Sequence, residues 1–466
     1  MIVVDYFMFS LYTYFNNKSR KKQKMRDLTS GNISKNLILY AIPALFSILL
    51  NRAYSTIDVI MVGQLLGENG LAAVGCTDGF VTALASFSFG AATGISIYLG
   101  TLMSKKENES LVSAIKSNLF FIMTFAFTLS VIALLFYKPI FHILNIKNTI
   151  YKDAFYYLVA IILSNVFSAA NTMINDAFCC FGNPSHALKI TFISCVVNII
   201  LNYVFMKILG LGVLGAGLAT FIALGVGFIA NLFSINKIIR SLSSKKAKFK
   251  INKQDIFSAL KLALPCMLQQ FALQGSSLIL QPVVNNFGES FIASYSIAMN
   301  LYNICTLCFF TTSRGMSVFC TQCYGSNKMH LIKKGMLLTI LYTSCLAVPI
   351  ILAILIFPTF VSSLFIKDVT SDTALFVIKY IVTCFPFIIF AVGNNYFHNF
   401  FRGVLKPNYA FISTSVYAVV RIATSILLIS KYGINAVYYG FIISWITEFT
   451  VCLIFFLSNK WKKRSE

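Results

Sequence analysis

The feature that most constrains this chain is a series of long apolar segments separated by short polar ones. A helix needs about 20 apolar residues to cross a bilayer, and twelve segments are long enough. The chain is 58% apolar, only 11% charged and has a mean hydropathy of +0.78. A soluble domain carries about 25% charged residues. The sequence therefore predicts an all-α polytopic membrane protein. The predicted spans are 36–63, 71–102, 112–137, 151–180, 185–208, 212–237, 257–287, 291–323, 332–358, 372–400, 407–430 and 434–459.

The two halves of the chain resemble each other. IP at 42–43 corresponds to LP at 264–265, and SIYLGTLMSKKE from Ser96 corresponds to SVFCTQCYGSNK from Ser317. Six spans followed by six similar spans predict two pseudo-symmetric six-helix bundles, as in many secondary transporters. The predicted parts are an N-terminal extension at 1–30, an N-terminal lobe at 31–240, a basic linker at 241–256, a C-terminal lobe at 257–460 and a tail at 461–466.

The basic residues indicate how the chain is oriented. The formal net charge is +23. Lys and Arg concentrate before the first span, in the even-numbered linkers and in the tail. The positive-inside rule then places both termini in the cytoplasm. Loops this short can attract anionic lipid but form no basic groove, so nucleic-acid binding is not expected. We interpret residues 1–24 as an upstream extension or a mis-assigned start, with an interfacial anchor as the alternative.

A carboxylate, Asp58, lies inside the first predicted span. An ionised carboxylate in hydrocarbon is costly and marks a functional site by default. Such a group can accept a proton or bind a cation, and the alternative is an Asp that only sets helix packing. On a helix, the residues that share its face are Asn51, Tyr54, Ser55, Met61 and Val62.

Amides in two other spans are candidates for the same site or for a substrate cleft. Asn198 and Asn202 are four residues apart and point the same way on a helix. They could bind an ion, or they could hydrogen-bond between helices. The second half has no acid at the position that corresponds to Asp58, near Gln281. A site built on a membrane carboxylate is therefore predicted in the first half, while Gln281 and Asn285 could line a cleft or pack helices.

Other polar residues in the spans have structural interpretations. Arg52, Arg314 and Arg421 could neutralise Glu448, Asp176, lipid phosphate or an anionic substrate, and structural pairing is favoured. We interpret the cysteines as packing residues. The histidines, interpreted as interfacial residues near span ends, are His142, His186, His330 and His398. The sequence has no Walker A, HExxH or GxSxG motif to support ATPase or hydrolase chemistry.

Several stretches match a known family. They include AYSTIDVIMVGQLLGENGLAAVG, VVNIILNYVFMKILGLGVLGAGLAT and LQPVVNNFGESFIASYSIA. On these residues the chain resembles the multidrug and toxic compound extrusion (MATE) transporters, and among them the bacterial DinF-like and Mep-type branch. The resemblance covers about residues 25–460. It implies twelve helices in two lobes, as in the MOP superfamily, with a central cleft.

The resemblance also implies a site. Asp58 matches the family's acid on the first helix, and Asn198, Asn202 and Thr220 match its other ion-coupling positions. The family often has an Asp where this chain has Asn202, so one carboxylate is missing. The coupling ion is H⁺ or Na⁺, with these four residues as possible Na⁺ ligands and no other cofactor. The expected substrate-cleft residues are Tyr54, Ser55, Met61, Gln274, Gln281, Asn285 and Asn300.

The resemblance finally implies a function. We expect a monomeric, non-enzymatic efflux transporter in a bacterial inner membrane, which exports small organic compounds, cationic or amphipathic, in antiport with H⁺ or Na⁺ by alternating access. The first alternative is a lipid-linked oligosaccharide flippase of the same superfamily. A membrane-embedded transferase is less well supported because no cluster of catalytic acids or histidines is visible. A channel is disfavoured because duplicated halves suit alternating access.

Overall fold

The computed structural model describes residues 27–143, 146, 150–243, 251–366, 368 and 370–462, and every regular element in these ranges is a helix. The first half comprises α2 (Ile33–Lys105), α3 (Asn108–Leu135), α4 (Tyr137–Ile143), α5 (Tyr151–Cys180), α6 (Pro184–Asn202), the π-helix η2 (Tyr203–Ile208) and α7 (Gly212–Leu242). The second half comprises α8 (Lys253–Asn285), α9 (Glu289–Gly325), α10 (Ile332–Ile356), α11 (Pro358–Ser363), α12 (Asp372–Cys384), α13 (Ile388–Gly403), α14 (Pro407–Tyr432) and α15 (Asn435–Leu457), with the short 3₁₀-helices η3 (Met329–Leu331), η4 (Phe385–Phe387) and η5 (Lys460–Lys462).

The longest element, α2, is two membrane helices joined at a glycine. Gly67 has φ 70° and ψ −163°, a conformation that only glycine adopts without strain. The segments on either side, Ile33–Gly67 and Asn69–Lys105, are each long and apolar enough to cross a membrane. Residues of both segments line one cavity, which places the two helices side by side.

The observed helices agree with the predicted spans. Among the described residues, eleven helices are long and apolar enough to cross a membrane, and each corresponds to one predicted span. The twelfth predicted span, 291–323, corresponds to α9, a helix of 37 residues. The prediction of an all-α polytopic membrane protein is confirmed.

Local sequence sets where corresponding helices begin. Pro184 and Pro407 occupy the first turn of α6 and α14, where a missing N–H costs nothing. The side chains of Asn32 and Asn252 cap α2 and α8 by accepting hydrogen bonds from backbone amides of the first turn. The two halves therefore share start signals as well as helix lengths.

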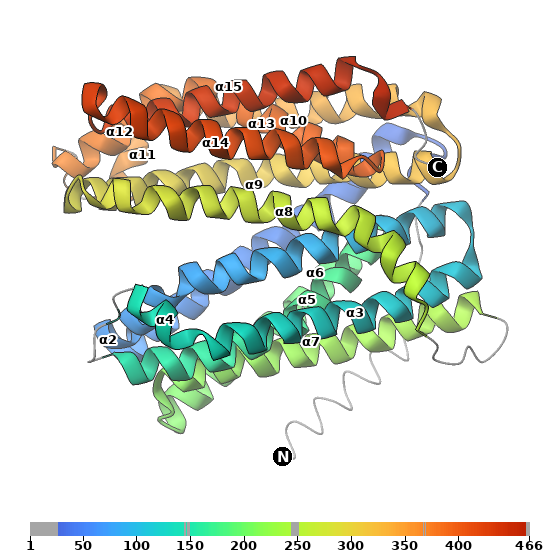
Figure 1. Cartoon of the computed structure of the whole chain (residues 1–466), viewed down its shortest axis with the longest axis horizontal. Coiled ribbons are helices and arrows are strands. Elements are labelled where there is room, and N and C mark those ends of the chain that lie inside the picture. Colours follow the sequence, from blue (N-terminus) through green and yellow to red (C-terminus); the bar gives the residue numbers. More distant parts are fainter. Residues whose placement is uncertain are drawn as a thin grey trace.

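The helices form two layers (Figure 1), which we call the N lobe (α2–α7) and the C lobe (α8–α15). The lobes meet where the second segment of α2 crosses α8. A Cβ on Gly94 would lie 2.3 Å from the Cα of Ala263, and one on Gly90 would lie 2.5 Å from the Cα of Met267. The two backbones touch because these positions lack side chains, as at small-residue contacts between membrane helices.

Two predicted parts fall mostly outside the described residues, and a third is described only in part. The extension at 1–30 is described only from Asp27, and the tail at 461–466 only through Lys462. The basic linker predicted at 241–256 is described at its two ends. There α7 continues to Leu242 and α8 begins at Lys253, so both helices run further into the linker than their predicted spans.

Candidate functional site

The four predicted ion-coupling residues form one hydrogen-bonded group, the Asp58 cluster (Asp58, Asn198, Asn202 and Thr220). Asn202 Nδ2 donates to Asp58 Oδ1 over 2.5 Å and to Asn198 Oδ1 over 2.9 Å. Asn198 Nδ2 donates to Thr220 Oγ1 over 3.2 Å. The cluster joins three helices, α2, α6 and α7, and both asparagines are fully buried.

The partners of Asp58 are neutral. In the described part of the chain, no Lys, Arg or His forms an ion pair with this carboxylate. Asn202 Oδ1 is buried and accepts no hydrogen bond. Carboxylate, amide and hydroxyl oxygens are the ligands that hard cations prefer. The arrangement therefore suits uptake of either a proton by Asp58 or a small cation by its oxygen atoms.

A π-helix follows the cluster directly. Helix α6 ends at Asn202, and η2 continues the chain from Tyr203 to Ile208 with one extra residue per turn. Short π-helical segments are rare and occur frequently at functional sites. Because π-helices have no simple residue pattern, sequence reasoning missed this one.

The predicted substrate-cleft residues are spread along three helices. Tyr54 is half-buried with its hydroxyl enclosed, Met61 packs on the N-lobe core, and Ser55 is exposed. Gln274 is half-buried and Asn300 is exposed. Gln281 Nε2 donates to Asn285 Oδ1 over 2.9 Å, and both side chains are exposed. None of them lines either cavity found in the described residues, so their assignment to a cleft stays a prediction.

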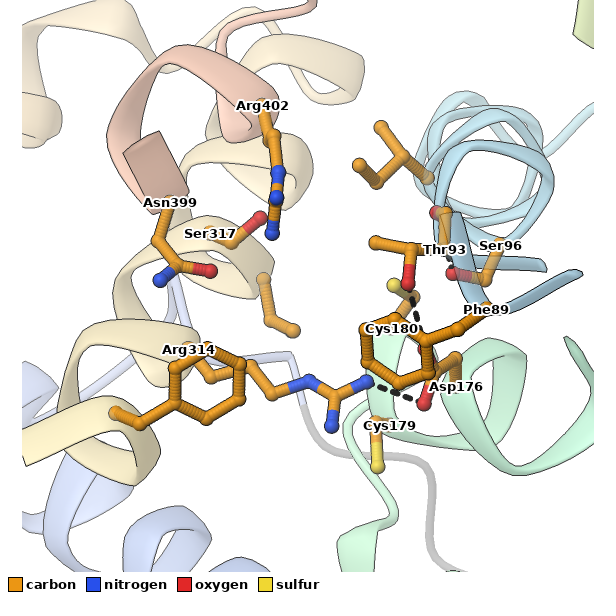
Figure 2. A pocket seen from close by; sticks show the side chains of 13 residues that line it. Phe89, Thr93, Ser96, Asp176, Cys179, Cys180, Arg314, Ser317, Asn399 and Arg402 are labelled. Atoms are coloured by element: carbon orange, nitrogen blue, oxygen red, sulfur yellow. Dashed lines mark hydrogen bonds and ion pairs between the residues drawn. The ribbon is translucent and has the colours of Figure 1, made fainter. Parts of the chain in front are cut away.

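An ion pair between a half-buried arginine and a buried aspartate joins the two lobes, at a place we call the inter-lobe seam. Arg314 of α9 pairs with Asp176 of α5, and Thr93 Oγ1 donates to Asp176 Oδ2 over 3.4 Å (Figure 2). Asn399 and Arg402 of α13 lie across the same small pocket. A larger cavity of about 260 Å³ adjoins the seam on the N-lobe side, and its polar lining includes Asn51, Asn165, Thr172 and Asn175.

Comparison with known proteins settles the family. The MatE family model matches residues 43–204 and 265–427, one stretch in each lobe. The chain belongs to this family. Among solved structures, the Vibrio cholerae MATE transporter VcmN in its bent form resembles it with a TM-score of 0.82 at 17% identity, over 92% of this chain and 98% of that one. At this identity the likeness shows the fold alone.

Two curated bacterial MATE relatives carry multidrug names. The chain is 22% identical to "Probable multidrug resistance protein YpnP" of Bacillus subtilis over 286 residues, which is 61% of this chain and 63% of the relative. It is 23% identical to "Multidrug export protein MepA" of Staphylococcus haemolyticus over 311 residues, which is 66% and 68% of the two chains. The chain thus spans about two thirds of the relatives it matches. MATE proteins are transporters, so the prediction of a non-enzyme is confirmed.

The structure distinguishes the three arginines of this MATE protein. Arg314 pairs with Asp176, one of the acids proposed for it from the sequence. Arg421 is buried, and no carboxylate among the described residues pairs with it; it donates to Ser276, Ser277 and Tyr295 hydroxyls, and its guanidinium lies 4.2 Å from the centre of the Phe441 ring. Arg52 is exposed.

The interpretation of all four histidines as interfacial residues is wrong for two of them. His142 and His330 are exposed, but His186 and His398 are buried. His186 Nε2 lies 2.8 Å from Asn231 Oδ1 and its ring stacks on Phe178. His398 Nε2 lies 3.2 Å from Glu448 Oε1. Position near a predicted span end did not reveal this burial, because the helix packing decides which face turns inward.

Proposed function

We propose that this MATE protein is a secondary active efflux transporter that exports small organic compounds in antiport with H⁺ or Na⁺. The Asp58 cluster binds the coupling ion. The observation that supports this is the isolation of the Asp58 carboxylate among neutral partners that join three helices. A carboxylate placed only for packing would be expected to have a cationic partner, since a buried unpaired charge costs several kcal/mol.

The cluster can couple ion binding to helix position in a simple way. Without a coupling ion, the negative Asp58 accepts a hydrogen bond from Asn202. A proton on Asp58, or a cation between its oxygen and the free Asn202 Oδ1, removes that charge and changes which partners the carboxyl group prefers. Because Asn202 is the last residue of α6 and the π-helix begins at the next residue, this change acts where the helix geometry changes.

The relatives named for multidrug resistance and multidrug export support organic, cationic or amphipathic compounds as the substrate class. The basic linkers support cytoplasmic termini in a bacterial inner membrane. The C-terminal end of α7, the N-terminal end of α8 and η5 lie at the same end of the molecule (Figure 1), which fits this sidedness. We expect substrate to enter from that end and the protein to act as a monomer.

Transport by the reconstituted protein tests the proposal. The full chain is placed in liposomes, a pH gradient or a Na⁺ gradient is imposed separately, and movement of ethidium and related dyes is measured. We expect one gradient to drive transport. Asp58→Asn should remove that dependence while the protein still folds, because Asn keeps the size of the side chain and its acceptor oxygen.

A matched control separates charge loss in general from loss of this carboxylate. Asp153 is exposed in the first turn of α5, so Asp153→Asn should keep gradient-driven transport. Unchanged gradient dependence in Asp58→Asn would refute the role of the Asp58 cluster. Absence of dye movement under either gradient in the wild-type protein would refute dye export.

A further inference from the structure

The C lobe contains a buried acid and base in direct contact. His398 of α13 and Glu448 of α15 are 6% and 3% exposed, and His398 Nε2 lies 3.2 Å from Glu448 Oε1. Asn394 Nδ2 donates to the other carboxylate oxygen, Oε2, over 2.9 Å. Apart from the imidazole, Oε1 has no hydrogen-bond partner among the described residues. This buried oxygen is therefore satisfied only when His398 Nε2 carries a proton.

His398 Nε2 has a second set of partners for the state without that proton. Ser413 Oγ lies 3.2 Å away and Thr414 Oγ1 lies 3.4 Å away, both on α14. The Ser413 hydroxyl already donates to the Ala410 carbonyl over 3.0 Å, so Thr414 is the hydroxyl free to donate to Nε2. The ring nitrogen is thus placed to act as a donor to Glu448 or as an acceptor from Thr414.

Thr414 connects this pair to the inter-lobe seam. Gln269 Nε2 donates to Thr414 Oγ1 over 3.0 Å, and Arg402 Nη2 donates to Gln269 Oε1 over 2.5 Å. Arg402 then lies at the pocket that also holds Arg314 and Asp176 (Figure 2). We call the group from Glu448 and His398 through Thr414 and Gln269 to Arg402 the Glu448 network.

Charged and titratable side chains from several helices surround the pair. Arg402 and Arg421 are buried, and no described carboxylate lies within ion-pair distance of either. The other titratable groups that face Glu448 are Tyr302 of α9, Tyr417 of α14 and Cys452 of α15. With two arginines nearby, a second proton on the pair would add positive charge where the cations already exceed the acids.

We propose that the His398–Glu448 pair is a second proton-binding site, in the C lobe, that loads and releases one proton independently of Asp58. On loading, His398 Nε2 takes a proton from water and donates it in a hydrogen bond to Glu448 Oε1. On release, the proton returns to water and Nε2 accepts from Thr414. The exchange breaks the hydrogen bond from Thr414 to Nε2 on loading and restores it on release, in a network that reaches the seam between the lobes.

The test is a titration of the histidine rings by NMR. The full chain, labelled at the imidazole nitrogens of its 4 histidines, is placed in phosphatidylcholine–phosphatidylglycerol nanodiscs. Spectra from about pH 5 to about pH 9 span the ordinary range of histidine ionisation. The His398 signal is assigned by His398→Gln, and also by elimination through removal of the exposed His142 and His330. We expect His398 to pass between charged and neutral forms within this range.

Variants separate this site from a structural ion pair and from the Asp58 cluster. Glu448→Gln should lower the proton occupancy of His398 at neutral pH at least tenfold, because the carboxylate no longer stabilises the cation. The His186 signal should not respond, since its partner is Asn231. Asp58→Asn should leave the His398 titration unchanged.

Two results would overturn the proposal. One is a His398 ring that keeps a single protonation state throughout the titration, which is what a fixed ion pair would give. The other is an occupancy that Glu448→Gln does not change. If Glu448→Gln fails to fold, the wild-type titration alone decides the question. Failure of Asp58-dependent transport with a titrating His398 would refute the proposed function and leave this site intact.

Discussion

In the N lobe, a membrane carboxylate, Asp58, is surrounded by amides and a hydroxyl; in the C lobe, a membrane carboxylate, Glu448, contacts a histidine in a region that also holds two buried arginines. The lobes repeat the same order of helices, yet their polar interiors differ in charge. A neutral environment makes the charge of Asp58 easy to cancel with a small ion. The Glu448 carboxylate instead has an imidazole, that of His398, within hydrogen-bond distance.

The seam between the lobes is where the two environments meet, and breaking it should have the largest effect. Asp176→Asn leaves the half-buried Arg314 guanidinium without its carboxylate partner. Removing one partner of a buried ion pair costs about 3–5 kcal/mol. Thermal unfolding of the purified protein in detergent measures the loss. The double variant Asp176→Asn, Arg314→Gln should recover part of it; if both variants unfold like the wild type, the pair does not hold the lobes together.

Glu448→Gln should also destabilise the protein, but less. The variant removes the ion pair with His398, and we expect a cost of about 2–3 kcal/mol. The cost is smaller than for Asp176→Asn because His398 can lose its proton, whereas an arginine cannot. The same unfolding measurement checks this. Equal losses for Glu448→Gln and Asp176→Asn would mean that His398 keeps its charge without Glu448.

The contact between α2 and α8 should respond to added volume regardless of charge. Gly94→Ala places a methyl group against the Ala263 backbone, and overpacking of this kind costs about 1–3 kcal/mol. A Cβ added at Gly275, in the middle of α8, would meet no atom within 4 Å, so Gly275→Ala is the matched control. The control should be neutral or stabilising by up to about 1 kcal/mol. If Gly275→Ala also destabilises the protein, the effect of Gly94→Ala cannot be assigned to the contact between α2 and α8.

Asp58→Asn should change stability least among the membrane carboxylates. Its partners are neutral, so the variant loses a charge-assisted hydrogen bond but also removes a buried charge. We expect a net change below about 1 kcal/mol. Unfolding temperatures of Asp58→Asn and Glu448→Gln, measured side by side, sharpen the contrast between the lobes. If Asp58→Asn lowers the stability as much as Glu448→Gln does, this contrast between the lobes does not hold.

A site outside the membrane gives the smallest effect and a defined pH dependence. Partial burial alone would raise the pKa of the Asp27 carboxyl, but hydrogen bonds from Thr29 and the charge of Lys328 outweigh it and lower the pKa. A lowered folded-state pKa contributes stability above the unfolded value of 3.8, and this is lost as the pH falls through the folded-state pKa. Asp27→Asn should cost about 0.2–1 kcal/mol at neutral pH and nothing in strong acid, as measured by unfolding at several pH values.

The fold and one of the two polar groups could be predicted from the sequence, for identifiable reasons. Lipid offers no hydrogen-bond partners, so each apolar segment must pair its own backbone N–H and C=O groups. The length of an apolar segment therefore predicts a membrane helix. Asn198 and Asn202 lie four apart on one helix, and the family resemblance linked them to Asp58. His398 and Glu448 are 50 residues apart on α13 and α15. Their contact depends on how these helices rotate against each other, and no spacing rule encodes that rotation.

The crossing at Gly90 and Gly94 has a mechanical consequence. At this crossing the backbones of α2 and α8 are in contact, without interlocking side chains that would resist rotation of one helix against the other. The crossing can therefore serve as a pivot. The helix from Asn69 to Gly90 is about 31 Å long at about 1.5 Å per residue. A rotation of about 10° there would swing its far end by about 5 Å, roughly one helical turn. A slight tilt at the crossing would therefore become a displacement of molecular size at the Asn69 end of the helix.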